Sequence, residues 1–303
     1  MDSFIKTAVG APWRTAVISV DQFSRADIDE IFDLADRLST GRTTPLGGKI
    51  IANVFYEPST RTSSSFFSAM TRLGGSVIPI NEVNYSSVTK GESLEDTIRT
   101  LENYCDLVVL RHFENDATER AMAVSKIPII NAGNGSGEHP TQALLDLYTI
   151  KKEHGGVDDL TISLMGDLKF GRTVHSLTKL LRMYDCRLQF VAPNQLAMPN
   201  EYIWPADKIY EDLNEAIESS DVLYVTRVQK ERMQGSEDFD FSYAVTVDHM
   251  TKAKTDMVLM HPLPRVGEIP TELDSDPRAA YFRQMKYGLH VRMALLYAMI
   301  GNV

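Results

Sequence analysis

Three hydroxyl side chains and one arginine occupy residues 59–62, where a strand pattern over residues 50–56 changes to a helical pattern over residues 59–73. The start of a helix collects free backbone N–H groups and the positive end of the helix dipole. With hydroxyls and a guanidinium beside them, these groups suit a phosphate or a carboxylate. The alternative is an ordinary helix start capped by Ser59, but a cation such as Arg61 in the first turn opposes the dipole unless an anion offsets it.

Cationic and polar side chains also end other apolar runs of the sequence. Arg111 follows the run 107–110, and Arg227 lies directly after the run 222–226. In an open parallel sheet, ligands bind beyond the carboxyl ends of the strands, so each arginine is either a solvent-facing cap or a site residue. His261 ends a further run and is followed by Pro-Leu-Pro, a segment that leaves backbone carbonyl oxygens without partners.

Two loops carry further candidates. The polar segment 84–93 has Lys90 at its tip, where the lysine is either functional or an incidental charge in a solvated loop. A glycine-rich segment precedes His139 and Gln142, which open a helical pattern. An imidazole and an amide can hold a carbonyl or an amide group, and the alternative is a capping threonine beside a surface histidine. Together, at least five predicted strand ends in two sheets carry cationic or polar groups, a pattern that is improbable by chance.

A dinucleotide-binding turn would read Gly-x-Gly-x-x-Gly between a strand and a helix. The segment 166–173 lies between such a strand and helix, but it contains only Gly166 and Gly171. The glycine pattern therefore fails, which argues against a nucleotide-binding regulator.

The chain has 303 residues, of which 43% are hydrophobic and 24% charged, as in ordinary water-soluble proteins long enough for two domains. Its 31 basic and 41 acidic side chains give a net charge of −10. This balance argues against a nucleic-acid partner, because a polyanion needs a basic surface. A small anionic ligand remains compatible with it.

Short β-branched or apolar runs alternate with helical patterns, which is typical of parallel sheets covered by helices. The predicted fold is therefore α/β, with two doubly wound domains that each contain a mainly parallel sheet. We expect residues 1–140 to form the first domain and residues 141–284 the second, with a C-terminal helix over 285–303 packing back on the first. Expected strands cover residues 50–56, 76–80, 107–111, 128–131, 160–167, 187–192, 222–226 and 257–261. Expected helices begin near Ser24, Ser59, Ser93, Asp116, Thr141, Gly171, Leu213 and Asp276.

The remaining features concern the compartment. Cys105 and Cys186 are too few for a disulfide framework and lack the spacing of a zinc site, so we expect free thiols, no metal site and a reducing environment. No apolar run approaches the roughly 18 residues that span a bilayer, and the first 20 residues lack the apolar core of a secretory signal. These features predict a cytoplasmic protein without a membrane partner.

Seven motifs in order along the chain closely resemble those of the aspartate carbamoyltransferase catalytic chain. The resemblance covers almost the whole sequence, and the last helix resembles the version of this domain in eukaryotic multifunctional pyrimidine-synthesis enzymes. The matched segments are residues 59–62, 90–92, 111–112, 139–142, 166–173, 227–232 and 261–265.

The resemblance implies transfer of the carbamoyl group of carbamoyl phosphate to L-aspartate, in pyrimidine synthesis and without a cofactor. The residues implied to bind carbamoyl phosphate are Ser59, Thr60, Arg61, Thr62, Ser86, Lys90, Arg111, His139, Gln142, Pro262 and Leu263. Among these, the resemblance gives catalytic roles to Arg61, Thr62, Lys90, Arg111 and His139. The residues implied to bind aspartate are Lys90, Arg172, Arg227 and Gln229.

The resemblance also implies a homotrimer, because Ser86 and Lys90 would reach the site of a neighbouring subunit. The chain would be either free or tethered to other domains of the pathway. Ornithine carbamoyltransferase is the nearest alternative, but its His-Cys-Leu-Pro motif has cysteine where Pro262 stands here, and Arg227 suits a carboxylate better than an ammonium. A catalytically silent subunit of the same fold is the other alternative, and it would be expected to lose site cations that this sequence retains.

Overall fold

The computed structural model describes residues 11–41, 44–80, 91–135, 137–228 and 243–301. Three residues of the predicted site, Ser86, Lys90 and Gln229, lie outside these ranges. The chain divides into two compact units, which are described separately below. Unit 1 comprises residues 1–144 and 287–303, and unit 2 comprises residues 145–286.

Unit 1 is built on a five-stranded sheet with the order β1-β5-β4-β2-β3, in which all neighbouring strands are parallel. The chain passes from β2 to β3 in one direction and from β4 to β5 in the other, so the order reverses between the neighbours β2 and β4 and the sheet is doubly wound. The strands are β1 (Ala16–Val17), β2 (Ile50–Phe55), β3 (Ser76–Ile80), β4 (Leu107–His112) and β5 (Ile129–Asn134).

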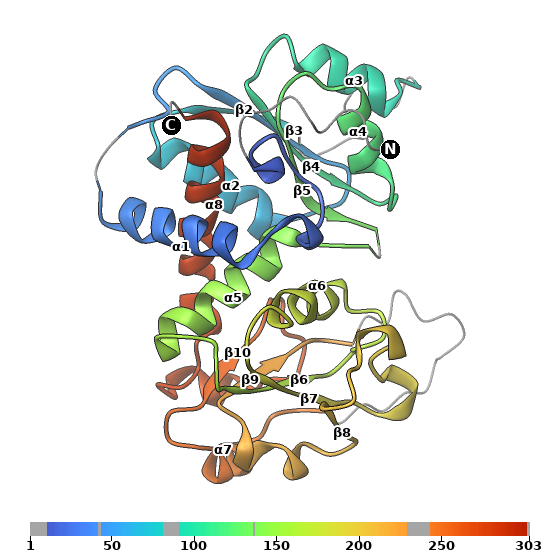
Figure 1. Ribbon diagram of the computed structural model, residues 1–303, viewed down its shortest axis with the longest axis vertical. Helices are drawn as coiled ribbons and strands as arrows, with labels where there is room; N and C mark the ends of the chain where they lie inside the picture. Colours follow the sequence, from blue (N-terminus) through green and yellow to red (C-terminus); the bar gives the residue numbers. More distant parts are fainter. Residues whose placement is uncertain (1–10, 42–43, 81–90, 136, 229–242, 302–303) are drawn as a thin grey trace. The chain divides into compact units, whose positions relative to one another are not determined.

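Helices cover both faces of this sheet (Figure 1). The alternation along β2 explains why, since successive side chains of a strand point to opposite faces. Ala52 and Val54 pack in a cluster with residues of α3 and α4, whereas the Asn53 amide between them donates a hydrogen bond to the Ser63 carbonyl of α2 at 3.1 Å. The helices are α1 (Arg25–Thr40), α2 (Thr60–Arg72), α3 (Leu94–Leu101) and α4 (Ala117–Val124).

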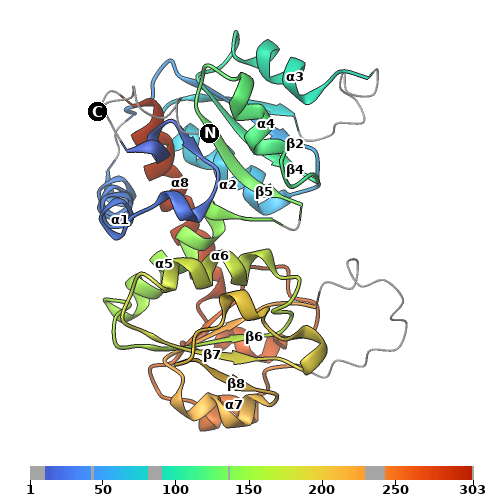
Figure 2. The same cartoon turned by 45° about the vertical axis from the view of Figure 1, so that its right-hand side comes forward.

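Unit 2 repeats the architecture, with parallel strands in the order β10-β9-β6-β7-β8. Leu223 and Val225 face a core shared with α7, whereas Tyr224 between them contacts Asp146 of α5. Figure 2 shows α5 and α6 on one face of the sheet and α7 on the other. The elements are β6 (Thr161–Met165), α6 (Arg172–Leu181), β7 (Arg187–Val191), β8 (Lys208–Tyr210), β9 (Val222–Val225), α7 (Val247–Lys252) and β10 (Val258–Met260).

Two long helices each contribute residues to both units. The division falls between Leu144 and Leu145 in α5 (Pro140–His154) and between Lys286 and Tyr287 in α8 (Tyr281–Ile300). The later part of α8 buries Ala294, Leu295 and Leu296 in unit 1, and Arg292 donates a hydrogen bond to Ser65 of α2 at 2.9 Å. None of the helices in the described part of the chain is long and apolar enough to cross a membrane.

The structure confirms the α/β class with two parallel sheets, and each predicted strand is present. Two predicted helices are wrong in detail. The helix expected near Leu213 is a pair of short 3-10 turns, Leu213–Glu215 and Ile217–Ser219. The last helix begins at Tyr281 and not at Asp276, because the Asp276 carboxylate accepts the backbone N–H of Arg278 and forms a separate turn.

Further short 3-10 turns connect the main elements. The described ranges also contain short elements that the sequence did not predict, namely β1, β8 and α7. Cys105 and Cys186 are free thiols, as expected. Among the described residues, the other 3-10 turns lie at Pro12–Arg14, Val20–Gln22, Asn194–Leu196, Asn200–Tyr202 and Thr271–Ser275.

Candidate active site

The turn from β2 into α2 carries the hydroxyl cluster of residues 59–62. Ser59 is the N-terminal cap residue of α2 by position, yet its side chain accepts no hydrogen bond from the first turn, all of which the structure describes. The ordinary serine-capped start is therefore wrong for this helix. Thr62 is buried and Arg61 is exposed, so this helix start presents N–H groups, hydroxyls and a guanidinium together.

Arg111 lies beside this turn because β2 and β4 are neighbours. Its register partner is Phe55, and its carbonyl accepts the N–H of Tyr56 at 2.9 Å. The guanidinium donates from Nε to Glu57 Oε2 at 3.1 Å, and Nη1 lies 3.4 Å from Ser59 Oγ. With its side chain 17% exposed, Arg111 is not a solvent-facing cap.

His139 and Gln142 lie at the start of α5. Both are at least nine-tenths buried, so the surface-histidine alternative is wrong. The neighbouring Glu138 fixes this segment, because its carboxylate accepts hydrogen bonds from Ser19 Oγ at 2.9 Å and from the N–H of Val20 at 2.8 Å.

Sheet order explains why these three segments of unit 1 belong together. Strands β2, β4 and β5 are consecutive neighbours, and the hydroxyl turn, Arg111 and the segment that leads to His139 each follow or end one of them. A hydrogen bond from the N–H of Gly135 to the His112 carbonyl, at 2.9 Å, continues the pairing beyond β4 and β5. Unit 1 thus places hydroxyls, guanidinium groups and an imidazole at the carboxyl edge of its sheet.

Unit 2 carries two arginines at the corresponding edge of its own sheet. Arg172 is the first residue of α6 and is 7% exposed, and Arg227 follows β9 and is half-buried. Strands β6 and β9 are neighbours, and Gly166 after β6 has φ +116°. A Cβ atom at Gly166 would lie 2.2 Å from the Thr226 carbonyl oxygen, so glycine is what allows the two strand ends to approach.

The segment after β10 has an unusual backbone. Leu263 adopts φ +56°, a conformation that costs a residue with a Cβ about 1–2 kcal/mol, and a cis peptide bond joins it to Pro264. The N–H of Leu263 donates to His261 Nδ1 at 2.8 Å, which leaves His261 Nε2 to donate to Glu268 at 2.7 Å. Within the described residues, the Pro262 and Leu263 carbonyl oxygens accept no hydrogen bond, as the sequence predicted.

Several acidic residues around these segments were missed by the sequence analysis. Glu57 binds Arg111, Glu138 orders the chain before His139, and Glu268 accepts from His261. Burial raises the pKa of Glu268, but hydrogen bonds from His261 and from the backbone N–H of Val266 outweigh it, so the net pKa is lowered. The position of Glu57 two residues before the hydroxyl turn was the one signal that could have identified a countercharge.

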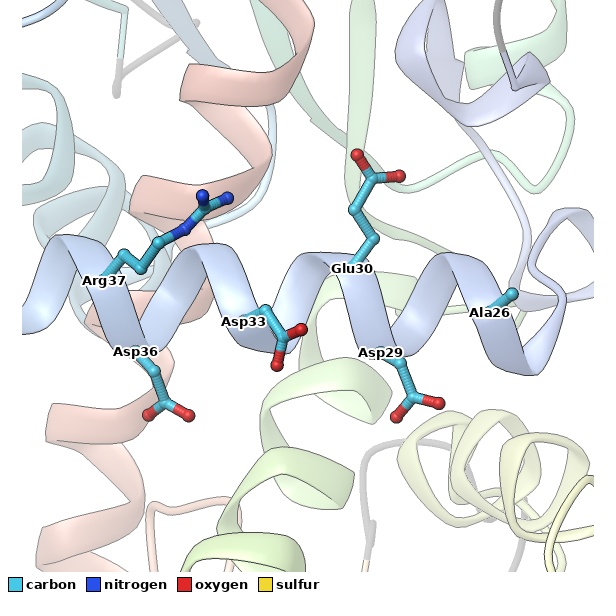
Figure 3. Close-up of a pocket in the computed structure, with 6 residues that line it drawn as sticks. All are labelled: Ala26, Asp29, Glu30, Asp33, Asp36 and Arg37. Atoms are coloured by element: carbon cyan, nitrogen blue, oxygen red, sulfur yellow. The ribbon is translucent and has the colours of Figure 1, made fainter.

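A separate surface hollow runs along α1 and does not fit an anion. Figure 3 shows its lining side chains along this helix. The hollow offers one guanidinium against a majority of carboxylates, which repel a phosphate or a dicarboxylate. Its lining residues are Ala26, Asp29, Glu30, Asp33, Asp36 and Arg37.

Two family models together match most of the chain. Residues 15–152 match the model of the aspartate/ornithine carbamoyltransferase carbamoyl-P binding domain, and residues 158–299 match that of the Asp/Orn binding domain. An aspartate carbamoyltransferase catalytic subunit from Thermoplasma acidophilum is 47% identical, over 95% of this chain and 98% of that protein. The multifunctional protein pyr1-3 of Dictyostelium discoideum is 50% identical, over 94% of this chain but only 13% of that protein.

Solved structures of aspartate transcarbamoylase have the same fold as this chain. Aspartate transcarbamoylase from Trypanosoma cruzi in complex with N-(phosphonacetyl)-L-aspartic acid has a TM-score of 0.88 and 46% identity, over 95% of this chain and 96% of that chain. Its ligand-free form has a TM-score of 0.84 and 44% identity, over 95% and 97% of the two chains. This chain therefore belongs to the aspartate/ornithine carbamoyltransferase family, among its aspartate carbamoyltransferases.

Proposed function

We propose that this chain transfers the carbamoyl group of carbamoyl phosphate to the amino group of L-aspartate, giving N-carbamoyl-L-aspartate and phosphate in pyrimidine synthesis. The observation that carries the proposal is that each unit places arginines at the carboxyl edge of its own sheet. Arg111 lies with the hydroxyl turn in unit 1, and Arg172 and Arg227 lie in unit 2. Two anionic substrates require two such groups of cations, because their mutual repulsion must be offset.

Residues 1–140 with 285–303 form the carbamoyl-phosphate domain in this proposal. The phosphate binds to the N–H groups and side chains at the start of α2, with Arg111 as a further donor. Thr62, Arg111 and His139 contact the carbamoyl oxygen. Gln142 and the carbonyl oxygens of residues 262–263 accept hydrogen bonds from the carbamoyl amino group, which only donates.

Residues 141–284 form the aspartate domain. Arg172 and Arg227 bind the two carboxylates, and Gln229 and Lys90 complete the site from segments outside the described residues. The burial of Arg172 supports this role, because a buried guanidinium binds a carboxylate more strongly than an exposed one does.

The reaction itself is an acyl transfer. The aspartate amine attacks the carbamoyl carbon, a C–N bond forms, and the bond from that carbon to the phosphate oxygen breaks. Negative charge develops on the carbonyl oxygen, where fixed donors from Thr62, Arg111 and His139 stabilise it. The amine proton has two acceptors of suitable chemistry, the departing phosphate and the His139 imidazole.

The proposal extends to assembly and location. Ser86 and Lys90 would complete the site of a neighbouring subunit in a homotrimer, as the family resemblance implies. The relatives named multifunctional proteins support a chain that is tethered to other pathway domains in some settings. The free thiols of Cys105 and Cys186 support a reducing, cytoplasmic location.

A carbamoyl-transfer assay that offers aspartate and ornithine in parallel tests the function directly, with the size of the same sample measured in solution. We expect carbamoylation of aspartate by a particle of three chains. Ornithine should be a poor substrate, because its side-chain ammonium would face the cationic groups of unit 2. A preference for ornithine, or no transfer to either amine, would contradict the proposal.

A further inference from the structure

We propose that Gln284, in the first turn of α8, is a positioning residue that holds the Pro262 and Leu263 carbonyls in place. Asp146 of α5 fixes the Gln284 amide in this role. The inference rests on the proposed function, in which those two carbonyl oxygens accept the carbamoyl amino group. All of these residues belong to unit 2.

The Gln284 side chain is fully buried and makes two hydrogen bonds of opposite direction. Its Oε1 accepts from the backbone N–H of His261 at 3.0 Å, and its Nε2 donates to Asp146 Oδ1 at 2.6 Å. The orientation of the amide is fixed by chemistry, because a backbone N–H can only donate and a carboxylate can only accept. Gln284 thus joins α5 to the residue that directly precedes the two carbonyls.

Asp146 is also fully buried, and it holds the amide from the other side. Its second oxygen accepts a hydrogen bond from the Tyr224 hydroxyl of β9 at 2.8 Å. Burial, with the adjacent charge of Asp146, raises the pKa of Tyr224 well above its ordinary value, so this hydroxyl stays protonated. A buried carboxylate with hydrogen-bond donors on both oxygens is a rigid acceptor, which leaves Gln284 little rotational freedom.

The first turn of α8 also holds the other end of the loop. Arg265 donates to the Tyr281 hydroxyl at 3.1 Å and to Asp274 Oδ2 at 2.7 Å. Tyr281 and Gln284 are three residues apart and therefore lie on one side of the helix. Gln284 thus holds His261 at the start of the segment 261–265, and Tyr281 holds Arg265 at its end. The positive φ of Leu263 lies between these two anchored residues.

The Gln284→Met variant tests the inference in the full-length protein, because methionine keeps the length of the side chain and removes both hydrogen bonds. Two ligands separate an effect on the carbamoyl group from an effect on the phosphate. Carbamoyl phosphate is used as the substrate, and inorganic phosphate is used as a competing inhibitor. We expect kcat/KM for carbamoyl phosphate to fall by about tenfold or more, with the inhibition constant of inorganic phosphate unchanged within about twofold. The phosphate-binding groups lie in unit 1, which the substitution does not touch.

Asp146→Asn is the matched conservative variant. Asn Oδ1 still accepts from Gln284 Nε2, and its amide can donate to the Tyr224 oxygen, so we expect carbamoyl phosphate kinetics within about threefold of wild type. Asp146→Leu removes the acceptor and should reproduce the selective loss of Gln284→Met. If these residues only supported folding, their substitution would weaken the binding of carbamoyl phosphate and of inorganic phosphate to a similar extent. It would also lower the unfolding temperature in proportion.

Three results would overturn the inference. These are wild-type kinetics in Gln284→Met, equal weakening of carbamoyl phosphate and inorganic phosphate, or an Asp146→Asn variant as impaired as Asp146→Leu. If Gln284→Met does not fold, Gln284→Glu takes its place, because it keeps the acceptor for His261 and loses the donor to Asp146. Failure of the proposed function is recognised separately, since the wild-type protein would then transfer no carbamoyl group to aspartate.

Discussion

Arg61 occupies an electrostatically unfavourable position for a cation, the second residue of α2, where the helix dipole is positive. Arg111 in the neighbouring strand adds a second positive charge and is held by Glu57. The arrangement is explained if an anion binds between the two guanidinium groups and the N–H groups of the helix start.

Truncation of Arg61 should therefore affect turnover and not folding. We expect Arg61→Ala to lower kcat/KM for carbamoyl phosphate roughly 30-fold to 1,000-fold, because a charge-assisted contact to the phosphate is lost. This decrease corresponds to a loss of about 2–4 kcal/mol of transition-state stabilisation. Arg72→Ala is the matched control, since Arg72 is an exposed arginine in the last turn of the same helix. Steady-state kinetics within tenfold of wild type in Arg61→Ala would refute the role of Arg61.

Several residue partnerships of the site could not be predicted from the sequence. The hydrogen bond between Gln284 and Asp146 joins residues that are 138 positions apart in the sequence, and the hydrogen bond between Arg111 and Glu57 joins residues that are 54 positions apart. No local pattern encodes such pairs, because they depend on which helices and strands become neighbours. The cations and hydroxyls were visible because they stand at strand ends, where the sequence changes from apolar to polar.

At the scale of the elements, apolar runs predicted the long strands well, and capping chemistry predicted some helix starts. Ser24 and Asp27 form the full capping box of α1, and Ser93 caps α3 through the N–H of Asp96. The short elements were not predicted from the sequence, for physical reasons. Strand β1 has only two residues and β8 only three, and Ile209 of β8 is 58% exposed, so both are too short for a strand pattern to stand out.

The close approach of β6 and β9 gives a prediction about Gly166. An alanine at position 166 would adopt a positive φ, and its Cβ would also clash with the Thr226 carbonyl oxygen. Gly155→Ala introduces only the backbone strain of a positive φ, since no atom lies within 4 Å of its added Cβ. We expect Gly155→Ala to lower the free energy of unfolding by about 1–2 kcal/mol. Gly166→Ala should lower it by a clearly larger amount and reduce aspartate binding, as measured by denaturant unfolding and kinetics. Equal effects of the two substitutions would contradict the close approach.

Asp274, which binds Arg265 in the loop after β10, predicts that the stability of the protein depends on pH in the acid range. Hydrogen bonds from Arg265 and Tyr281 lower the pKa of Asp274 to about 2 from its ordinary 3.8. A carboxyl group with a lowered folded-state pKa stabilises the protein above the unfolded pKa, and the contribution disappears as the pH falls from near 4 to near 2. Denaturant unfolding at several pH values should show Asp274→Asn less stable than wild type at pH 7, with the difference shrinking in that window. A difference that stays constant from pH 7 to pH 2 would contradict it.

At the scale of the whole molecule, a net charge of −10 contrasts with the local chemistry of the site. Each unit places a few arginines at the carboxyl edge of its sheet, and the proposed function assigns the binding of substrates to them. Overall charge thus excludes polyanions while local arginines select small anions. The length near 300 residues is explained by two α/β units of similar design, each with its own core.

Sharing of sites between subunits is a prediction at this scale. Lys90→Ala and Arg61→Ala chains should each be strongly impaired alone, and mixing them with subunit exchange should restore activity. A site built from Arg61 of one chain and Lys90 of its neighbour is intact in a mixed trimer, and random exchange in a three-fold ring gives about a quarter of wild-type activity. Each variant taken through exchange by itself is the control. Exchange that is verified by mass and restores no activity would rule out sharing.

In the proposed reaction, the arginines of unit 1 bind the phosphate and those of unit 2 bind the aspartate carboxylates. Calorimetric titration with N-(phosphonacetyl)-L-aspartic acid, which joins both anions, tests it most directly against titration with inorganic phosphate. We expect Arg61→Ala and Arg172→Ala each to weaken the joined ligand by about tenfold or more, while only Arg61→Ala weakens inorganic phosphate. These assignments are wrong if Arg172→Ala leaves the affinity for the joined ligand unchanged, or if it weakens phosphate binding as much as Arg61→Ala does.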